Sequence, residues 1–328
     1  MKRRSFIKTA SVFAGSVTAA KLLSRNATAQ NIKELNFGII STESQANQKP
    51  IWEPFIAAMS DELGMPVKAF YATQYAGVIE AMRFGQVQLA WYGGKSYIEA
   101  AKRAEAEVFA QTVADDGSKG YYSHLIMNAD HPDLAKAVEM GGDKYVLENA
   151  SKLQFAFNDP NSTSGYLVPS YYVFAQNGVN PNNAFKRLVF AGNHEATALA
   201  IANNQVDVAT NNNESLSRLE KTNPQARTKI ETIWTSTLIP SDPIAWRKDL
   251  PEDIKAKLRD FFYTYNDATV LGALEWSKFV PASDDMWNPI RELNIGKQIL
   301  DVQNNESLSQ ADKNKKIAEL EEELAAIE

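Results

Sequence analysis

The sequence contains no cysteine among its 328 residues. Without cysteine the chain has no disulfide framework, no thiolate nucleophile and no sulfur for lipid attachment. It also contains no H-E-x-x-H zinc pattern, no Walker loop and no G-x-S-x-G nucleophile elbow. We therefore expect no metal and no cofactor, and stability that comes from an apolar core, which a chain of this size can supply.

Positive charge is also scarce, with 34 Lys and Arg residues against 40 Asp and Glu residues. Six of the basic residues and none of the acidic ones precede residue 30, so the remainder of the chain carries a formal charge of −12. This balance argues against nucleic acid, whose binding requires a basic face. Any anion site in this chain has to work through local hydrogen-bond donors.

The N-terminus lacks an apolar run long enough to span a bilayer comfortably. Instead, Arg3 and Arg4 begin a twin-arginine pattern, a weakly apolar run covers 9–20, and 27–29 reads Ala-Thr-Ala, an A-x-A-like cleavage site. We predict a twin-arginine signal peptide over 1–29, which implies export of the folded protein to the periplasm. The alternative is an uncleaved membrane anchor.

After this segment, strand and helix patterns alternate. Apolar runs predict strands at 34–40, 67–71 and 87–91, with helices at 51–63, 75–84 and 95–104 between and after them. The order then repeats with strands at 153–157, 186–190 and 205–209 and helices at 165–177 and 195–204. This alternation predicts an α/β fold with mostly parallel sheets flanked by helices.

Two extended segments, 109–125 and 233–246, are predicted to connect the halves. Two crossings make the first lobe discontinuous, so we expect lobe one at 30–120 and 245–300 and lobe two at 121–244. A C-terminal helix is expected over 301–328. Ligands of such two-lobed proteins bind in the cleft, at the carboxyl ends of the strands.

The most informative segment is Asn158–Gly165, which reads Asn-Asp-Pro-Asn-Ser-Thr-Ser-Gly. It places three consecutive hydroxyl groups where a predicted strand passes into a predicted helix. The first turn of a helix leaves N–H donors unpaired and carries partial positive charge, so this segment can bind an oxyanion without a metal or a lysine. The alternative is a simple N-cap, which needs only one hydroxyl.

Several segments, in order along the chain, resemble the phosphonate-binding periplasmic proteins of ABC importers. They include Leu-Asn-Phe-Gly-Ile-Ile-Ser-Thr-Glu-Ser at 35–44, Asp-Pro-Asn-Ser-Thr-Ser-Gly at 159–165 and Leu-Ile-Pro-Ser-Asp-Pro-Ile at 238–244. Shorter matching segments lie at 75–77, 90–93, 120–122, 192–195 and 208–214. The resemblance covers nearly the whole chain after the signal, and it implies a two-lobed type II periplasmic binding protein without catalytic activity.

The resemblance also implies a set of ligand-binding residues. Those that would hold the phosphonate oxygens are Ser162, Thr163, Ser164 and His194. Tyr75 and Tyr121 would line the cleft, and Glu214 and Asp242 would bind an ammonium group, as on 2-aminoethylphosphonate. The partner implied is an ABC permease in the membrane. One departure is Asn193, which separates Gly192 from His194 where the family pattern places the two together.

Each of these residues also has a structural interpretation. An acid at position 214 could complement a helix dipole, an aspartate at 242 could close a turn, and the tyrosines and the histidine could be packing residues. The same fold could bind phosphite, phosphate, methylphosphonate or a sulfonate instead. A rival of another class is a serine hydrolase that uses Ser162 or Ser164 with His194 and Asp242.

The C-terminal segment leaves two alternatives open. Its apolar residues Ile317, Leu320, Leu324 and Ile327 follow the a/d spacing of about two heptads, which is short for a coiled coil. The helix would either pack back on lobe one or pair with a second copy of the chain in a homodimer.

Overall fold

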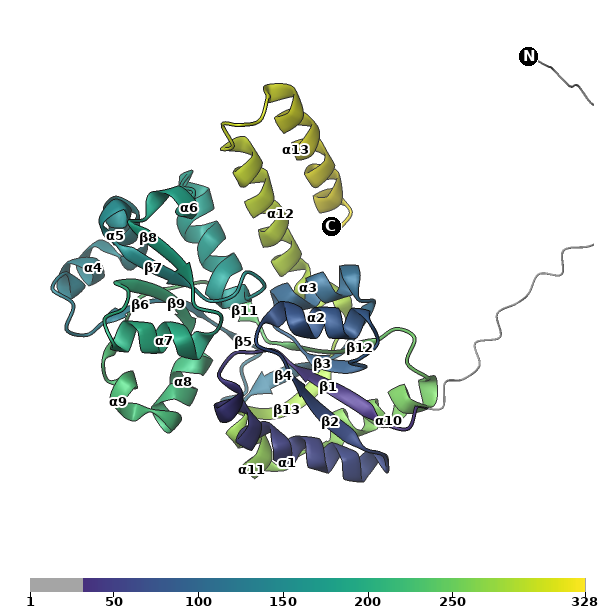
Figure 1. The fold of residues 1–328 in the computed structure, drawn as a ribbon. Coiled ribbons are helices and arrows are strands. Elements are labelled where there is room, and N and C mark those ends of the chain that lie inside the picture. Colours follow the sequence, from purple (N-terminus) through teal and green to yellow (C-terminus); the bar gives the residue numbers. More distant parts are fainter. Residues whose placement is uncertain (1–31, 328) are drawn as a thin grey trace, which may run out of the picture. The chain divides into compact units, whose positions relative to one another are not determined.

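The structure is a computed structural model that describes residues 32–327 (Figure 1). Six strands form its larger sheet. Their order across the sheet is β13–β4–β12–β3–β1–β2. The bounds are β1 Leu35–Ile39, β2 Val67–Tyr71, β3 Leu89–Trp91, β4 Ala106–Ala114, β12 Pro243–Arg247 and β13 Trp276–Pro281. We call this sheet and its helices lobe one.

Five strands form the second sheet, in the order β10–β6–β9–β7–β8. The bounds are β6 Ser123–Asn128, β7 Gln154–Phe157, β8 Arg187–Phe190, β9 Val208–Asn212 and β10 Ile230–Thr235. This sheet and its helices form lobe two. The two-lobed α/β architecture that the sequence predicts is therefore confirmed.

Both sheets are mixed, with a smaller parallel part than we expected. The alternating strand and helix segments give the parallel strands, which are β1, β2 and β3 in lobe one and β7, β8 and β9 in lobe two. The crossover segments contribute β4 and β12 to one sheet and β6 and β10 to the other, and all four pair antiparallel with their neighbours. The crossovers therefore bind the two lobes together as well as connecting them.

Helices flank both sheets (Figure 1). Those of lobe one are α1 Gln45–Leu63, α2 Tyr75–Arg83, α3 Gly94–Arg103, α10 Glu252–Thr264, α11 Ala268–Ala273 and the 3₁₀ turn η5 Asp284–Trp287. Those of lobe two are α4 Leu134–Met140, α5 Gly142–Asn149, α6 Pro181–Ala184, α7 His194–Ala202, α8 Asn213–Thr222 and α9 Pro224–Arg227, with the 3₁₀ turn η1 Ala150–Lys152. A largely π-helical segment of lobe two follows β7, and we call it the wide helix. It consists of the π-helices η2 Thr163–Leu167 and η3 Ser170–Phe174 and ends in the 3₁₀ turn η4 Ala175–Asn177.

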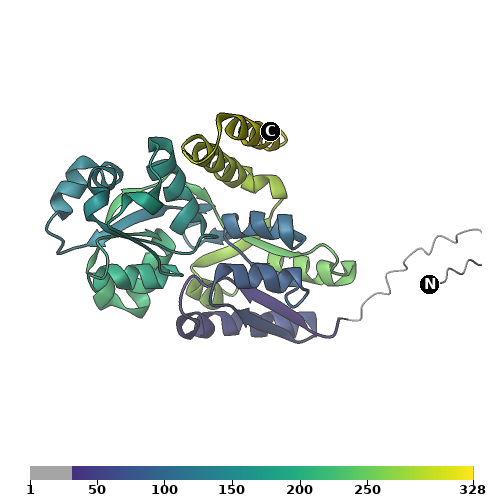
Figure 2. The same cartoon turned by 45° about the horizontal axis from the view of Figure 1, so that its top comes forward.

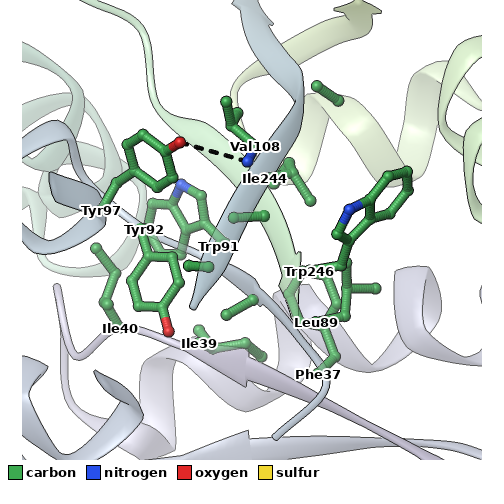
Figure 3. Close-up of a cluster of buried hydrophobic side chains, with 14 of the residues drawn as sticks. Phe37, Ile39, Ile40, Leu89, Trp91, Tyr92, Tyr97, Val108, Ile244 and Trp246 are labelled. Atoms are coloured by element: carbon green, nitrogen blue, oxygen red, sulfur yellow. Dashed lines mark hydrogen bonds between the residues drawn. The ribbon is translucent and has the colours of Figure 1, made fainter. Parts of the chain in front are cut away.

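Each lobe has its own apolar core. In lobe one, Phe55 of α1 is fully buried and its ring lies 6.4 Å or less, centroid to centroid, from several other aromatic rings. Strand residues such as Phe37, Trp91 and Trp246 contribute large side chains to the same cluster (Figure 3). In lobe two, Phe155 and other aromatic residues fill the space between β7 and the wide helix. The cores meet at one place, because Leu167 and Val168, which follow β7 in lobe two, belong to the cluster of lobe one.

The short strands β5 Gly120–Tyr121 and β11 Ile239–Pro240 pair with each other between the two sheets (Figure 1). The chain passes from one lobe to the other through these strands. We propose that the lobes divide here, close to the predicted boundaries at 120 and 245. Since β12 begins at Pro243, the return to lobe one starts two residues earlier than predicted.

The C-terminal helix that we predicted over 301–328 is wrong in its bounds, because two helices occupy this region. α12 spans Asn288–Gln303 and α13 spans Gln310–Ala325, and the two form a hairpin (Figure 2). The Ser309 side chain accepts a hydrogen bond from the backbone N–H of Asp312 at 3.2 Å and so caps a new helix. The a/d residues of α13 are partly buried against α12, while the end of α13 reaches lobe one through the Lys102–Glu323 ion pair of 3.5 Å.

The predicted twin-arginine signal and its cleavage site lie in 1–29, outside the residues that the structure describes. Within residues 32–327, no helix combines the length and the apolar composition that crossing a bilayer requires.

Candidate functional site

The turn after β7 orders the serine-rich segment by local hydrogen bonds. The Ser162 side chain accepts from the backbone N–H of Gly165 at 3.0 Å, which caps the wide helix as the sequence suggests. A Cβ atom on Gly165 would lie 2.4 Å from Cγ of Asn158, so only glycine fits this close turn. Asp159 closes the loop by accepting from the backbone N–H of Asn161 at 2.7 Å.

All three hydroxyl groups of this segment are buried, and each accepts a hydrogen bond from a different element. Ser162 accepts from Gly165 as above. Thr163 Oγ1 accepts from the backbone N–H of Lys95 in lobe one at 2.9 Å. Ser164 Oγ accepts from the Asn212 side chain at 3.1 Å. Because the oxygen is the acceptor in each of these bonds, each hydroxyl hydrogen is left to donate to an anion.

His194 lies beside these hydroxyl groups at the start of α7. Its Nε2 atom is 3.5 Å from Ser162 Oγ and 3.3 Å from Asn212 Nδ2, and its Nδ1 atom has no hydrogen-bond partner among the described residues. Asn193, the departure from the family pattern, caps α7 by accepting from the backbone N–H of Ala196 at 2.7 Å. The extra residue is thus absorbed by the helix cap, and His194 still faces the serines.

The protonation of His194 follows from its surroundings. Burial, the largest effect, lowers the pKa of His194 to about 3, so the imidazole is neutral at pH 7. The Asn212 oxygen accepts from the backbone N–H of Ser215 at 2.6 Å, so the Asn212 amide turns its N–H group toward His194. Nε2 is then the accepting nitrogen. A protonated imidazole at this position would require an anion next to this nitrogen.

At the other end of the site lie two carboxyl groups. Glu214 is at the start of α8, and Asp242 lies between β11 and β12. Asp242 Oδ2 accepts from the Trp91 indole N–H at 3.0 Å, whereas Oδ1 has no partner among the described residues. Burial raises the pKa of Glu214 to about 7 and holds that of Asp242 well above its ordinary value, and the negative charge of Glu214 raises the latter further.

Two tyrosines complete the walls of the site. Tyr75 begins α2 and is 2 % exposed, and Tyr121 belongs to β5 and is 4 % exposed. Burial raises the pKa of both phenols well above 10, and nearby carboxylates add to the effect. Both hydroxyl groups therefore remain protonated and can donate hydrogen bonds at any physiological pH.

All eight residues predicted for the site line one cavity between the lobes, at the carboxyl ends of β1, β3, β7 and β9. We call Ser162, Thr163, Ser164 and His194 the hydroxyl pole, and Glu214 and Asp242 the carboxyl pole. A Cβ atom on Gly93 would lie 3.3 Å from Thr163 Oγ1 and 3.8 Å from Asp242 Oδ1. These two oxygens are consequently no more than about 7.1 Å apart, because the two distances share one end.

The cavity is narrow, with a free volume of about 10 Å³. Hydrogen bonds between the lobes hold it this way. Apart from the Lys95–Thr163 bond, the backbone N–H of His194 donates to the Thr42 carbonyl at 3.0 Å, and that of Ser44 donates to the Glu195 carboxylate at 2.7 Å. The lobes are therefore closed around the site.

An ionic cluster beside the cavity also joins the lobes. Arg218 of α8 donates to Glu43 of lobe one at 2.8 Å and lies 3.7 Å from Glu275 of lobe one. Lys221 and Ser217 of α8 bond to the same Glu275 carboxylate at 2.8 and 2.7 Å. Burial lowers the pKa of Arg218, but these acids outweigh it and leave the pKa above its ordinary value.

Sequence reasoning missed five polar or small residues of the cavity wall. Four of them, Thr42, Trp91, Gly93 and Asn212, lie in segments that carry the family resemblance, but nothing in the sequence assigned them a role. The fifth, Arg218, follows Glu214 by four residues, a spacing that places both on one face of a helix. Among the described residues, no cluster of His, Asp and Glu is arranged to hold a metal ion.

Comparison with known proteins gives consistent matches. The family model described as ABC transporter, phosphonate, periplasmic substrate-binding protein matches residues 37–287. A phosphonates-binding periplasmic protein of Escherichia coli (strain K12) is 47% identical over 316 residues, which cover 95% of this chain and 91% of that protein. A phosphate-import protein of Mycolicibacterium smegmatis is 27% identical over 73% of this chain and 74% of its own length.

Among solved structures, a binding protein component of an ABC phosphonate transporter from Pseudomonas aeruginosa is 50% identical. It superposes with a TM-score of 0.85, over 90% of this chain and 96% of that one. The fold of this chain is thus similar to that of a known component of an ABC phosphonate transporter.

Replacing Glu214 with glutamine should stabilise the protein more at pH 8 than at pH 4.5. The folded-state pKa of Glu214, about 7, lies above its ordinary value of 4.5. The stability that the protonated carboxyl contributes is complete below pH 4.5 and is lost as the pH rises through about 7. The variant lacks this titrating group and avoids the loss. Its melting temperature relative to that of the wild type should therefore rise between pH 4.5 and pH 8, by roughly 2–4 °C for each kcal/mol of stability.

The control for this titration is Glu220→Gln, which removes an exposed carboxylate from the same helix. The difference between its melting temperature and that of the wild type should change little with pH. A Glu214→Gln difference that is equally constant from pH 4.5 to 8 would contradict the burial argument.

Proposed function

Because this chain belongs to the family of periplasmic phosphonate-binding proteins of ABC importers, we propose that it binds 2-aminoethylphosphonate and delivers it to the permease. It is a binding component and not an enzyme, as are the relatives that it matches. The observation that carries the choice of ligand is the arrangement of donors and acids in one cavity. Three hydroxyl donors gather at the hydroxyl pole, and the two acids of the carboxyl pole line the same cavity, where Asp242 Oδ1 has no hydrogen-bond partner among the described residues.

The hydroxyl pole suits the phosphonate group. Near neutral pH a phosphonate carries between one and two negative charges and three acceptor oxygens. Each hydroxyl or backbone N–H donor at a helix start can contribute roughly 1.5–3 kcal/mol net. Four or five such bonds, less the cost of immobilising the ligand, correspond to about 8–12 kcal/mol and a micromolar to nanomolar dissociation constant.

The carboxyl pole suits an ammonium group. Burial is the largest cause of the raised pKa values of Glu214 and Asp242, and a cation placed between the two carboxyl groups would restore their ionised forms. Arg218, the nearest protein cation, is already engaged by Glu43 and Glu275. The ammonium must be close to the phosphonate, because the poles are separated by at most about 7.1 Å at Thr163 and Asp242. A two-carbon spacer meets this requirement.

Ligands without a cation are the closer rivals, and one relative of this chain is named for phosphate import. Phosphite, phosphate, methylphosphonate or a sulfonate would use the hydroxyl pole equally well. They would leave the carboxyl pole either protonated or repelling the anion, so part of the cavity would oppose binding. This difference favours an aminophosphonate.

The hydrolase rival conflicts with the contacts of its supposed triad. In a serine hydrolase the second imidazole nitrogen is held by an acid. Here His194 Nδ1 has no partner among the described residues, and Asp242 is bonded to Trp91 instead. Ser162 is further engaged as a helix cap.

Transport by this protein would use closure about the β5–β11 pair. The donors of the hydroxyl pole belong to lobe two, whereas Tyr75, Trp91 and Asp242 lie on elements of lobe one or next to them. A ligand that touches both sets stabilises the closed state, in which the ionic cluster around Arg218 also forms. The permease would then recognise the closed form.

Two further proposals concern the rest of the chain. The predicted twin-arginine signal would carry the folded protein to the periplasm, where an importer of this family operates. The C-terminal hairpin would be the surface for a homodimer, since the outer face of α13 is exposed.

We expect 2-aminoethylphosphonate to stabilise the mature protein more than methylphosphonate, phosphite or phosphate does. The physical reason is that only the first ligand supplies a cation to the carboxyl pole. Titration calorimetry and thermal shift measure the difference, and the double variant Glu214→Gln and Asp242→Asn should narrow it. Equal stabilisation of the wild-type protein by 2-aminoethylphosphonate and methylphosphonate would contradict the assignment of the ammonium group.

The double variant Ser162→Ala and Thr163→Val should lose about 100-fold or more in affinity for every phosphonate, because it removes two hydroxyl donors from the anion. Calorimetry measures the loss. The matched control is Ser170→Ala, which removes a buried serine of the same helix that does not line the cavity. Unchanged affinity in a folded double variant would refute the anion-binding role of the hydroxyl pole.

Saturating 2-aminoethylphosphonate should reduce the radius of gyration in small-angle scattering, because the ligand favours the closed state. The same addition to the Ser162→Ala and Thr163→Val variant, at a concentration too low for it to bind, should leave the radius unchanged. A wild-type protein of one size with and without ligand would count against hinge closure.

A further inference from the structure

We propose that Trp91 is a positioning residue, which holds Asp242 so that one carboxylate oxygen faces the ammonium group of the ligand. The inference rests on the proposed function and adds a residue that selects for the ligand's cation. Its basis is the single hydrogen bond from the Trp91 indole N–H to Asp242 Oδ2, at 3.0 Å.

The bond gives the two carboxylate oxygens of Asp242 different roles. An indole N–H can only donate, so Oδ2 must be its acceptor and cannot carry a proton on that side. Oδ1 is left without a partner among the described residues, although Asp242 is only 8 % exposed. A buried oxygen without a donor is costly, and it is the place where a cation gains most.

The indole is itself held rigidly. Trp91 is the last residue of β3 and is 4 % exposed. Its ring lies 5.2 Å from that of Trp52 and 5.8 Å from that of Trp276, centroid to centroid, inside the core of lobe one. β3 pairs with β12, which begins one residue after Asp242, so the sheet holds the donor close to its acceptor. The core of lobe one thus sets the direction of Oδ1.

The bond also favours the charged form of Asp242. Burial and the charge of Glu214 raise the pKa of this carboxyl, and the hydrogen bond from Trp91 is the largest effect that opposes them, followed by Arg218 and Tyr121. Without the indole donor, the carboxyl would rotate more freely and accept a proton on either oxygen. An ammonium ligand would then have to displace a proton and also order the side chain.

The hydrogen bond reaches only the carboxyl pole. No hydroxyl group of residues 162–164 bonds to Trp91 in the described structure, so an anion bound there without a cation gains nothing from this contact. Trp91 should therefore affect ligands with an ammonium group and spare those without one. A residue that merely supports the fold would affect both kinds alike.

The test is Trp91→Phe, which keeps an aromatic ring in the core and removes the donor. We expect the variant to bind 2-aminoethylphosphonate about tenfold more weakly by calorimetry, with less than a twofold change for methylphosphonate. The matched control Trp52→Phe makes the same change on the neighbouring ring and should preserve the ratio of the two affinities. In an Asp242→Asn background, Trp91→Phe should cause no further loss specific to 2-aminoethylphosphonate.

If Trp91→Phe does not fold, benzothienylalanine at position 91 keeps the shape of the indole and replaces its N–H with sulfur. Equal losses for both ligands, or no loss for 2-aminoethylphosphonate, would overturn the proposal while leaving the proposed function intact. A wild-type protein that does not prefer 2-aminoethylphosphonate to methylphosphonate would instead refute the proposed function, and this inference with it.

Discussion

Two acids, Glu214 and Asp242, line one closed cavity, and the cation in its wall, Arg218, is shared with Glu43 and Glu275. This constraint shapes the rest of the site. Charged carboxylates in a low-dielectric interior are strongly unfavourable unless a positive group lies next to them. Glu214 and Asp242 escape only partly, by holding protons at pH values where acids are ordinarily ionised. The protein keeps them at a cost in stability, as functional sites often do, and a ligand with a positive end removes that cost.

At the opposite end of the cavity, the hydroxyl pole presents neutral groups instead of a cation to an anion. Ser162, Thr163 and Ser164 offer hydroxyl hydrogens because their oxygens are already acceptors of protein donors. His194 is neutral as well. A phosphonate is thus recognised by the direction of dipoles instead of a fixed positive charge, which agrees with a chain of net negative charge. Selection between ligands then depends on the far end of the molecule.

Much of this arrangement could be predicted from the sequence, because it depends on local chemistry. A strand followed by three hydroxyl residues and a helix specifies an anion site within eight residues, and order along the chain then identified the family. Arg218 and Asn212 could not be predicted in the same way. Asn212 contacts His194 only once β9 and α7 pack together within lobe two. Arg218 bonds to Glu43, which is far away in sequence and belongs to lobe one. The C-terminal helix predicted over 301–328 is present as α13, but it begins at residue 310, because Ser309 caps it there.

The α12–α13 hairpin has a mechanical consequence. α12 packs against α3 and η5 on one side of the β5–β11 pair and against η2, η3 and η4 on the other (Figure 2). A helix that packs against both lobes near the β5–β11 pair resists wide separation of the lobes and permits them to slide along its length. In the proposed closure, α12 would act as a strut that limits how far the two lobes separate.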